Sequence, residues 1–280
     1  MRYLAISLIV FTLATATLAA DNTGTASGAF LNLGLGARPM AMGNAFVALA
    51  DDCNALFWNP AGLADLKERE ILSMYTSWFQ ETKYAALTVA GPGLGFSAAY
   101  LDYGALDETT LAQPGGTGRT LNSGAMVYNF GYGRRLNEKV SWGVGVKLFG
   151  ENLGGNNASG YSLDAGGLFR VPERNLTLGL AAANLLGSLQ GKLTQTLTAG
   201  LAFKFLNLTS AADLGFTNDN GVKYKIGCEW DVNQRFYPRL GFDTGKLCCG
   251  FGLLMNRINF DYAYLLTGDL GATHRFSLKI

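Results

Sequence analysis

Long apolar runs are missing from most of this sequence. After the first twenty positions, no stretch reaches the roughly 18 apolar residues that a membrane-spanning helix needs. Charged residues are also scarce, at 15% of 280 residues, whereas soluble domains carry about 25%. Because hydrophobic residues still make up 49% of the chain and glycine contributes 37 residues, this composition indicates a protein that crosses a membrane with β-strands.

Side chains for catalysis or metal binding are scarce as well. The single histidine, His274, falls on the expected lipid-facing side of a strand, so a serine nucleophile would lack an imidazole base. The four cysteines lack zinc-site spacing and suit buried small hydrophobes, although a disulfide from Cys53 to another element is an alternative. Asp51 and Asp52 suit a helix cap and an ion pair with Arg38 better than a cation site. We therefore expect no enzyme, no cofactor and no metal.

From Glu70 onwards, apolar and polar residues alternate with the period of a β-strand. In the stretch 140–148, for example, Val140, Trp142 and Val144 alternate with polar residues and glycines. The predicted fold is an all-β transmembrane protein, an antiparallel outer-membrane β-barrel of about 14 strands with a short N-terminal helical plug inside its lumen. A soluble β-sandwich is the alternative. The predicted strands start near Glu70, Thr82, Gly93, Thr120, Val140, Ser159, Asn175, Lys192, Leu208, Gly221, Phe236, Lys246, Arg257 and Gly271.

The predicted connections differ in length between the two ends of this barrel. The longer ones, 104–119, 151–158, 185–191, 217–220 and 267–270, share one end, as expected for extracellular loops opposite short periplasmic turns. Charges of both signs face inward, and they predict either a polar conduit or ion pairs that brace the wall and hold the plug. The net charge of +1 implies no nucleic-acid partner.

The N-terminal residues have two distinct patterns. Residues 1–20 have a basic residue, an apolar run and a small-residue ending, which predicts a cleaved secretory signal; a membrane anchor is the alternative. We expect residues 21–67 to form the plug and residues 68–280 to form the barrel.

The stretch 34–66 is the part with a helical rather than a strand period. Pro39 suits the first turn of a helix, and the apolar residues up to Ala50 predict about three helical turns. An aspartate at 51 or 52 is expected to cap a second short helix through Phe57, which Asn59-Pro60 ends. A segment this apolar must be buried, and the lumen is the place available to it.

Two motifs in this stretch resemble the N-terminal signature of the PorV/PorQ family, which is similar in fold to the fatty-acid transporter FadL. The first motif is G-x-R-P-x-A-M-G-x-A-F-V-A-x-A-D-D, and the second is W-N-P-A-G-L-A. The ending 273–278 also resembles that family. The matching residues are Gly36, Arg38, Pro39, Ala41, Met42, Gly43, Ala45 to Ala48, Ala50 to Asp52 and Trp58 to Ala64.

The resemblance implies that an Asn-Pro-Ala segment plugs the lumen. The residues expected to form and gate this plug are Arg38, Pro39, Met42, Gly43, Phe46, Asp51, Asp52, Trp58, Asn59, Pro60, Ala61 and Gly62.

Two functions follow from the resemblance. The first is a component or shuttle of type IX secretion, with a translocon and its cargo proteins as partners. The alternative is a FadL-like channel for uptake of a hydrophobic small molecule, and a purely structural barrel is a third possibility. In each case we expect a monomer among outer-membrane lipids.

Overall fold

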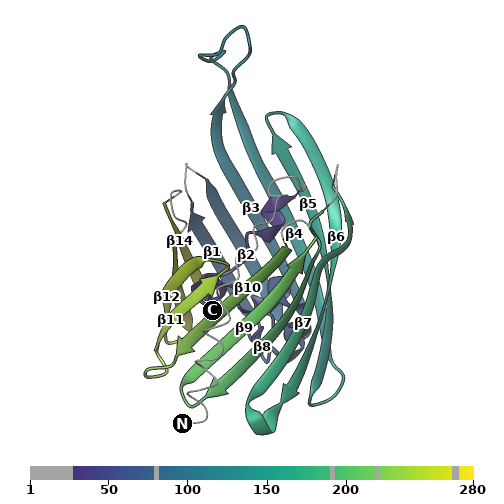
Figure 1. Ribbon diagram of the computed structural model, residues 1–280, viewed down its shortest axis with the longest axis vertical. Coiled ribbons are helices and arrows are strands. Elements are labelled where there is room, and N and C mark those ends of the chain that lie inside the picture. The colour runs from purple at the N-terminus through teal and green to yellow at the C-terminus, as the bar shows by residue number, and fades with distance from the viewer. Residues whose placement is uncertain (1–27, 79–81, 190–192, 219–220, 267–270) are drawn as a thin grey trace.

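The computed structural model describes residues 28–78, 82–189, 193–218, 221–266 and 271–280. The predicted secretory signal, residues 1–20, lies outside these ranges. Fourteen antiparallel strands close into a barrel, each hydrogen-bonded to its neighbours in chain order (Figure 1). The strands are β1 (Glu70–Ser77), β2 (Lys83–Gly91), β3 (Leu94–Asp107), β4 (Thr120–Arg135), β5 (Val140–Leu153), β6 (Asn156–Val171), β7 (Leu176–Ser188), β8 (Thr196–Phe205), β9 (Leu208–Thr217), β10 (Gly221–Trp230), β11 (Phe236–Asp243), β12 (Lys246–Met255), β13 (Ile258–Leu266) and β14 (Ala272–Lys279).

Closure depends on the pairing of the first strand with the last. Strand β1 pairs with β14 from Leu72 opposite Lys279 to Ser77 opposite His274. This pairing satisfies the backbone groups of both strand edges, which lipid could not do. The predicted fold class, a closed antiparallel barrel of 14 strands, is confirmed. No helix in the described ranges is long and apolar enough to cross a membrane.

The two faces of the wall differ in polarity. On β5, the side chains of Ser141 and Lys147 are buried, while those of Trp142, Val146 and Leu148 point outward and are exposed. The period of two therefore separates an inner face with polar side chains and glycines from an apolar outer face. The outer apolar residues form the surface that lipid would cover.

The barrel is taller on one side than on the other. Strands β3 to β7 have 13 to 16 residues, whereas β8 to β14 have 8 to 10. The β3–β4 hairpin projects farthest, and we call its end of the barrel the long-loop end and the opposite end the short-turn end (Figure 1). The loop predicted at 151–158 is wrong, because these residues continue β5 and β6 to a two-residue turn at Gly154 and Gly155. Both glycines have positive φ, which suits a tight hairpin.

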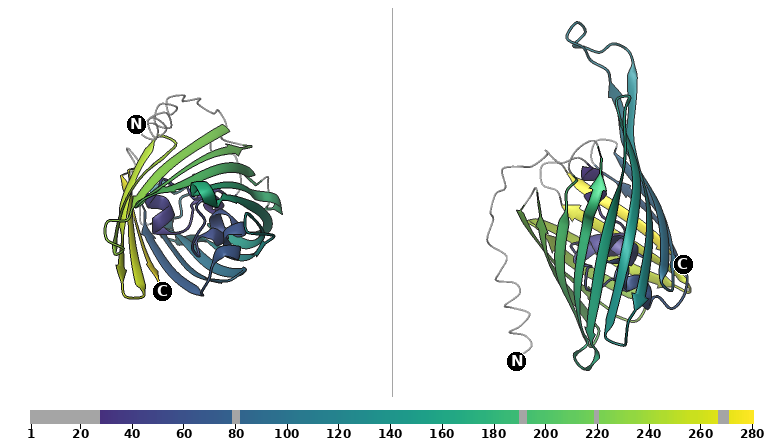
Figure 2. Two further views of the ribbon diagram at one scale, coloured as in Figure 1. Left: turned by 90° about the horizontal axis from the view of Figure 1, so that it is seen from below. Right: turned by 90° about the vertical axis from the view of Figure 1, so that its right-hand side faces the viewer.

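Residues 28–66, which we call the lumenal segment, run inside the barrel (Figure 2). Their helices are short: η1 (Ala29–Asn32), α2 (Ala37–Ala41), α3 (Ala55–Trp58) and η2 (Pro60–Asp65). The short helix η3 (Pro172–Arg174) lies in the β6–β7 turn.

The predicted three-turn helix from Pro39 to Ala50 is wrong. Helix α2 ends after one turn, because Gly43 and Asn44 both adopt left-handed backbone angles, with φ of 61° and 59°. A left-handed residue ends a helix, and Gly43 takes this conformation at little cost. The sequence predicts that the second helix ends at Asn59-Pro60. Helix α3 does end there, since Asn59 follows it in an extended conformation.

Candidate functional site

The lumenal segment is buried on almost all sides. Met42, Phe46, Leu56 and Leu63 are at most 2% exposed. The barrel wall, rather than water, surrounds the segment. The contacts between the segment and the wall therefore determine how much of the lumen is open.

Glycines on the inner face of the wall let the segment approach backbone to backbone. A Cβ atom on Gly241 would lie 2.0 Å from the backbone nitrogen of Gly43, and one on Gly143 would lie 2.4 Å from the carbonyl carbon of Pro60. Such separations are too short for any real side chain, so these positions require glycine. At Gly166 and Gly250, the segment presents the side chains of Asn59 and Ala41 instead of its backbone. We call the following glycines, at each of which an added Cβ would lie within 3 Å of the segment, the glycine collar: Gly133 on β4, Gly143 on β5, Gly166 on β6, Gly179 on β7, Gly200 on β8, Gly227 on β10, Gly241 on β11 and Gly250 on β12.

Arg38 joins the segment to the wall through charge. Its guanidinium donates to both carboxylate oxygens of Glu229, at 2.9 and 3.0 Å, and to Asp51 at 2.6 Å and Asp52 at 2.9 Å. Glu229 also accepts from Arg239 at 2.6 Å. A two-pronged contact between arginine and a carboxylate fixes orientation as well as distance.

This network continues to the first and last strands. Arg239 pairs with Asp261 at 2.6 Å, and Lys279 lies 3.6 Å from both Asp52 and Glu70. Burial alone would raise the pKa of the Asp52 carboxyl, but Lys279 and Arg38 outweigh it and hold the pKa well below its usual range. Asp52 therefore stays ionised at neutral pH.

Asn59, Pro60 and Ala61 form the turn that redirects the segment. The Asn59 amide donates to the carbonyl of Val47 at 2.8 Å and to that of Gly167 on β6 at 3.2 Å. Its side-chain oxygen accepts from the backbone of Ala61 at 3.1 Å, which caps η2. The asparagine thus holds the segment both to itself and to the wall.

Two further carboxylates anchor the segment. Asp213 on β9 accepts from the backbone nitrogens of Phe46 and Val47, at 2.8 and 3.0 Å. Near the short-turn end, Asp65 pairs with Arg135 at 2.5 Å and also with Arg170. These contacts support ion pairs, rather than a polar conduit, as the role of the inward charges concerned.

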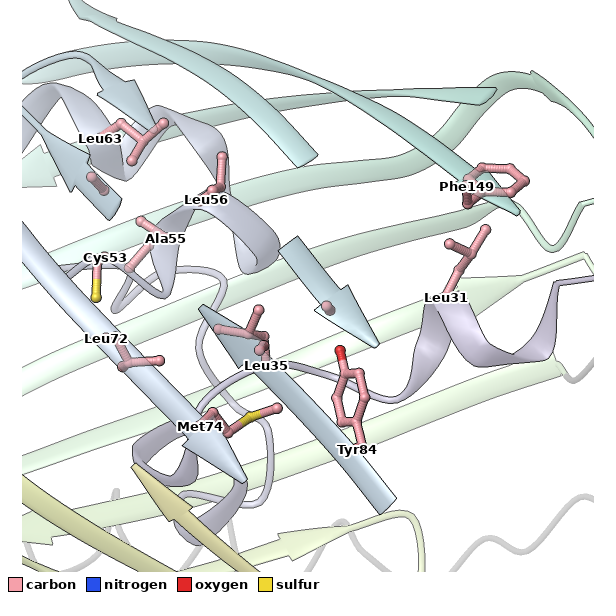
Figure 3. Packing of buried hydrophobic residues seen from close by; sticks show 14 of the residues in the cluster. Leu31, Leu35, Cys53, Ala55, Leu56, Leu63, Leu72, Met74, Tyr84 and Phe149 are labelled. Carbon is pink, nitrogen blue, oxygen red and sulfur yellow. The ribbon is translucent and has the colours of Figure 1, made fainter. Parts of the chain in front are cut away.

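The part of the segment nearest the long-loop end is held differently. Phe30 and Leu31 are buried, and the rings of Phe30 and Phe149 meet edge to face at 5.9 Å. Figure 3 shows Leu31 close to Phe149 and Leu35 close to Tyr84. We call this group the apolar cluster: Phe30, Leu31, Leu35, Tyr84, Leu101, Phe149, Leu189 and Leu193.

Arg275 on β14 lies beside this cluster and ties the next stretch of the segment. Its guanidinium donates to the Leu33 carbonyl at 3.1 Å, to that of Gly34 at 3.3 Å and to Thr76 at 2.9 Å, and it lies 5.9 Å from the Tyr84 ring. Polar ties thus hold the segment from Leu33 onwards, whereas Phe30 and Leu31 pack among apolar side chains.

The structure brings many of the predicted plug residues together. Arg38 meets Asp51 and Asp52 as expected, and Trp58 donates to the Leu35 carbonyl at 2.9 Å. The other predicted residues, Pro39, Met42, Gly43, Phe46, Asn59, Pro60, Ala61 and Gly62, are buried against the wall or against one another. Whether these residues gate the lumen stays a prediction.

Sequence reasoning missed the apolar cluster and the hydrogen bonds from the backbone of Phe46 and Val47 to Asp213. The sequence offered one weak signal for the cluster. Tyr84, Leu101 and Phe149 are large apolar residues at inward positions, where most neighbouring residues of the same strands are small or polar. Cys53 is a buried free thiol, and burial raises its pKa, so it behaves as a small hydrophobe. His274 lies outside the lumen, 2.9 Å from the Tyr262 hydroxyl.

Solved structures with the same barrel cover most of this chain. The CymD monoaromatic hydrocarbon channel has a TM-score of 0.62 at 12% sequence identity, over 88% of this chain and 96% of its own. The Pseudomonas putida toluene transporter TodX has a TM-score of 0.60 at 14% identity, over the same 88% and 96%. No protein-family model and no curated protein matches this sequence.

At these identities, the similarity shows the fold. It agrees with the predicted barrel, and membership of the PorV/PorQ family is not shown. The similar structures are channels rather than enzymes.

Proposed function

We propose that this protein is an outer-membrane channel for small apolar molecules. The observation that carries the proposal is the apolar cluster, which lines part of the lumen near the long-loop end with large apolar side chains. A channel for sugars or ions would present polar side chains there. Phe30 and Leu31 fill this part of the lumen with apolar groups, so the surrounding wall suits an apolar ligand of similar size. The similarity to two hydrocarbon channels supports this choice of ligand class.

The proposed orientation follows from the loops and the outer face. The long-loop end is extracellular and the short-turn end periplasmic, as in bacterial outer-membrane barrels. Outer-membrane lipids cover the apolar outer face of a monomeric barrel, and a cleaved signal at residues 1–20 brings the chain there. A ligand from outside therefore meets the apolar cluster before it meets the glycine collar.

The two parts of the lumenal segment have different roles in this proposal. The glycine collar and the ion pairs hold residues 37–66 across the lumen, so polar solutes are kept from crossing freely. Phe30 and Leu31 are displaced by the incoming ligand, because they are held by apolar contacts that the ligand can replace.

Uptake of labelled toluene by cells that express the chain tests the proposal. The wild-type chain should raise uptake above the empty-vector level, with little effect on a labelled disaccharide. Phe149→Glu should lower toluene uptake about tenfold, because a carboxylate in the apolar cluster disfavours an apolar ligand by more than 1 kcal/mol. Phe149→Leu is the matched control and should keep most of the uptake. A wild-type chain that leaves toluene uptake at the empty-vector level would refute the proposal.

The same experiment separates this function from the predicted role in type IX secretion. A secretion component would change the export of cargo proteins and leave toluene uptake unaffected. The contacts described here do not specifically favour a cargo protein, so the small-molecule channel is the function that we propose.

A further inference from the structure

A groove on the outer face of the tall wall is separate from the lumen. Tyr100 on β3 lies opposite Met126 on β4, which lies opposite Gly150 on β5. Gly124 is in the next outward-facing row, opposite Asn152. Because Gly150 carries no side chain and a Cβ atom there would meet no atom closer than 3.7 Å, the wall is hollowed beside Met126, whereas the Tyr100 side chain lies close over Gly124. The hollow has a volume of about 500 Å³.

The groove crosses the upper edge of the apolar band. Along the outer face of β4, the side chains run from Tyr132 near the short-turn end through Phe130 and Tyr128 to Met126. The stretch from Met126 to Tyr132 spans roughly 20 Å along the strand, which at a strand tilt of about 40° covers about 15 Å of the roughly 25 Å height of a lipid-facing band. Beyond Met126 the lining becomes polar, with amides at Asn122, Asn152 and Asn157. One end of the groove is therefore apolar and the other suits the headgroup region.

The polar end of the groove is uncharged. Asn152 donates to Asn157 at 2.8 Å, and both side chains are on the outward-facing side of a β5–β6 pair. The one charged lining residue, Glu151, occupies an inward position and accepts from the hydroxyl of Tyr103 at 2.8 Å. Amides donate and accept hydrogen bonds, which suits hydroxyl groups, and the groove presents no cation for a phosphate.

We propose that this groove binds a neutral glycolipid of the outer leaflet. The sugar hydroxyls lie against Asn122, Asn152 and Asn157, and the first acyl carbons lie over Gly150, beside Met126. The proposal rests on the orientation given under the proposed function, but not on the nature of the transported molecule.

Native mass spectrometry of the purified full chain tests this proposal. The probes are a dialkyl glucoside, phosphatidylglycerol and phosphatidylethanolamine with equal chain lengths. Gly150→Leu fills the groove without a backbone clash, since a Cβ there meets its nearest atom at 3.7 Å. Gly167→Leu on β6 is the matched control, because its Cβ also has room, at 3.9 Å, and its row on the outer face is away from the groove.

The wild-type chain should retain the glucoside about tenfold more strongly than either phospholipid. Gly150→Leu should abolish this preference, Gly167→Leu should keep it, and Asn157→Ala should reduce it. Heat-modifiable migration on a gel checks that each variant is folded. Equal retention of phospholipid and glucoside, no glucoside bound, or an unchanged preference in Gly150→Leu would each overturn the proposal. Because the readout is binding rather than uptake, this outcome is independent of the toluene experiment.

Discussion

At the scale of the residue, Arg38 has three carboxylate partners among the described residues. It is 12% exposed and contacts Asp51, Asp52 and Glu229, which come from both the lumenal segment and the wall. Removing one member of a buried ion pair is costly, because the remaining charge keeps its desolvation penalty. Arg38 therefore contributes to stability mainly by compensating carboxylates that cannot reach bulk water.

Arg38→Met should lower the free energy of unfolding by about 3 kcal/mol, because Glu229 and Asp52 lose a partner inside the lumen. Urea unfolding of the chain in lipid vesicles measures this change. Arg134→Met is the control, since Arg134 is exposed at the short-turn end of β4 and its loss should cost less than about 0.5 kcal/mol. Equal costs for the two variants would mean that the network does not hold the segment.

At the scale of the element, the lumenal segment is shaped by the wall that it contacts. Helix α2 ends where Gly43 meets Gly241, and η2 begins where Pro60 meets Gly143. Backbone-to-backbone packing of this kind tolerates no added methyl group, because interiors are packed to near-crystalline density. The glycine collar thus fixes the position of the segment against the wall.

Two alanine substitutions on β5 test this packing. Gly143→Ala should cost about 1–3 kcal/mol, because its Cβ would lie 2.4 Å from Pro60. Gly145→Ala should be nearly neutral, because its Cβ would meet no atom closer than 3.5 Å. In a background that keeps only Cys53, which is fully buried, a thiol reagent should label Cys53 about tenfold faster in Gly143→Ala than in Gly145→Ala. Equal labelling rates in the two variants would show that the segment is not closely packed against the wall.

At the scale of the whole molecule, the outer face must match the membrane. Val146 points outward near the middle of β5, while the next residue, Lys147, points inward and pairs with Asp164 at 2.6 Å. A shift of one residue in register would exchange these two environments. The difference between the two faces therefore favours one register of β5.

Val146→Arg should lower the free energy of unfolding in vesicles by about 2–4 kcal/mol, because it places a charge in the lipid near mid-membrane. Leu206→Arg should cost about 0–1 kcal/mol, because Leu206 lies in the β8–β9 turn and is 79% exposed. Similar costs at both positions would contradict the proposed position of the membrane.

The alternation along the chain determined the strands, their number and their two faces. Each strand depends on a period of two that nearby residues set by themselves, so β4, β5 and β9 to β12 begin at their predicted residues. The apolar composition of residues 34–66, without the period of a strand, likewise marked the segment that the barrel encloses. These features are local, because backbone geometry imposes them within a few residues.

Only the tertiary structure decided which residues of the wall contact which residues of the lumenal segment. Arg38 and Glu229 are 191 residues apart in the chain, and their contact exists because barrel closure and register bring β10 to that side of the segment. The helix predicted from Pro39 ends early at Gly43, where a local preference and a tertiary contact agree, because glycine adopts the left-handed conformation at little cost and the backbone of Gly43 packs against Gly241. Phe30 and Phe149 meet through closure as well, because the wall encloses a segment that has no fixed partner before the barrel forms.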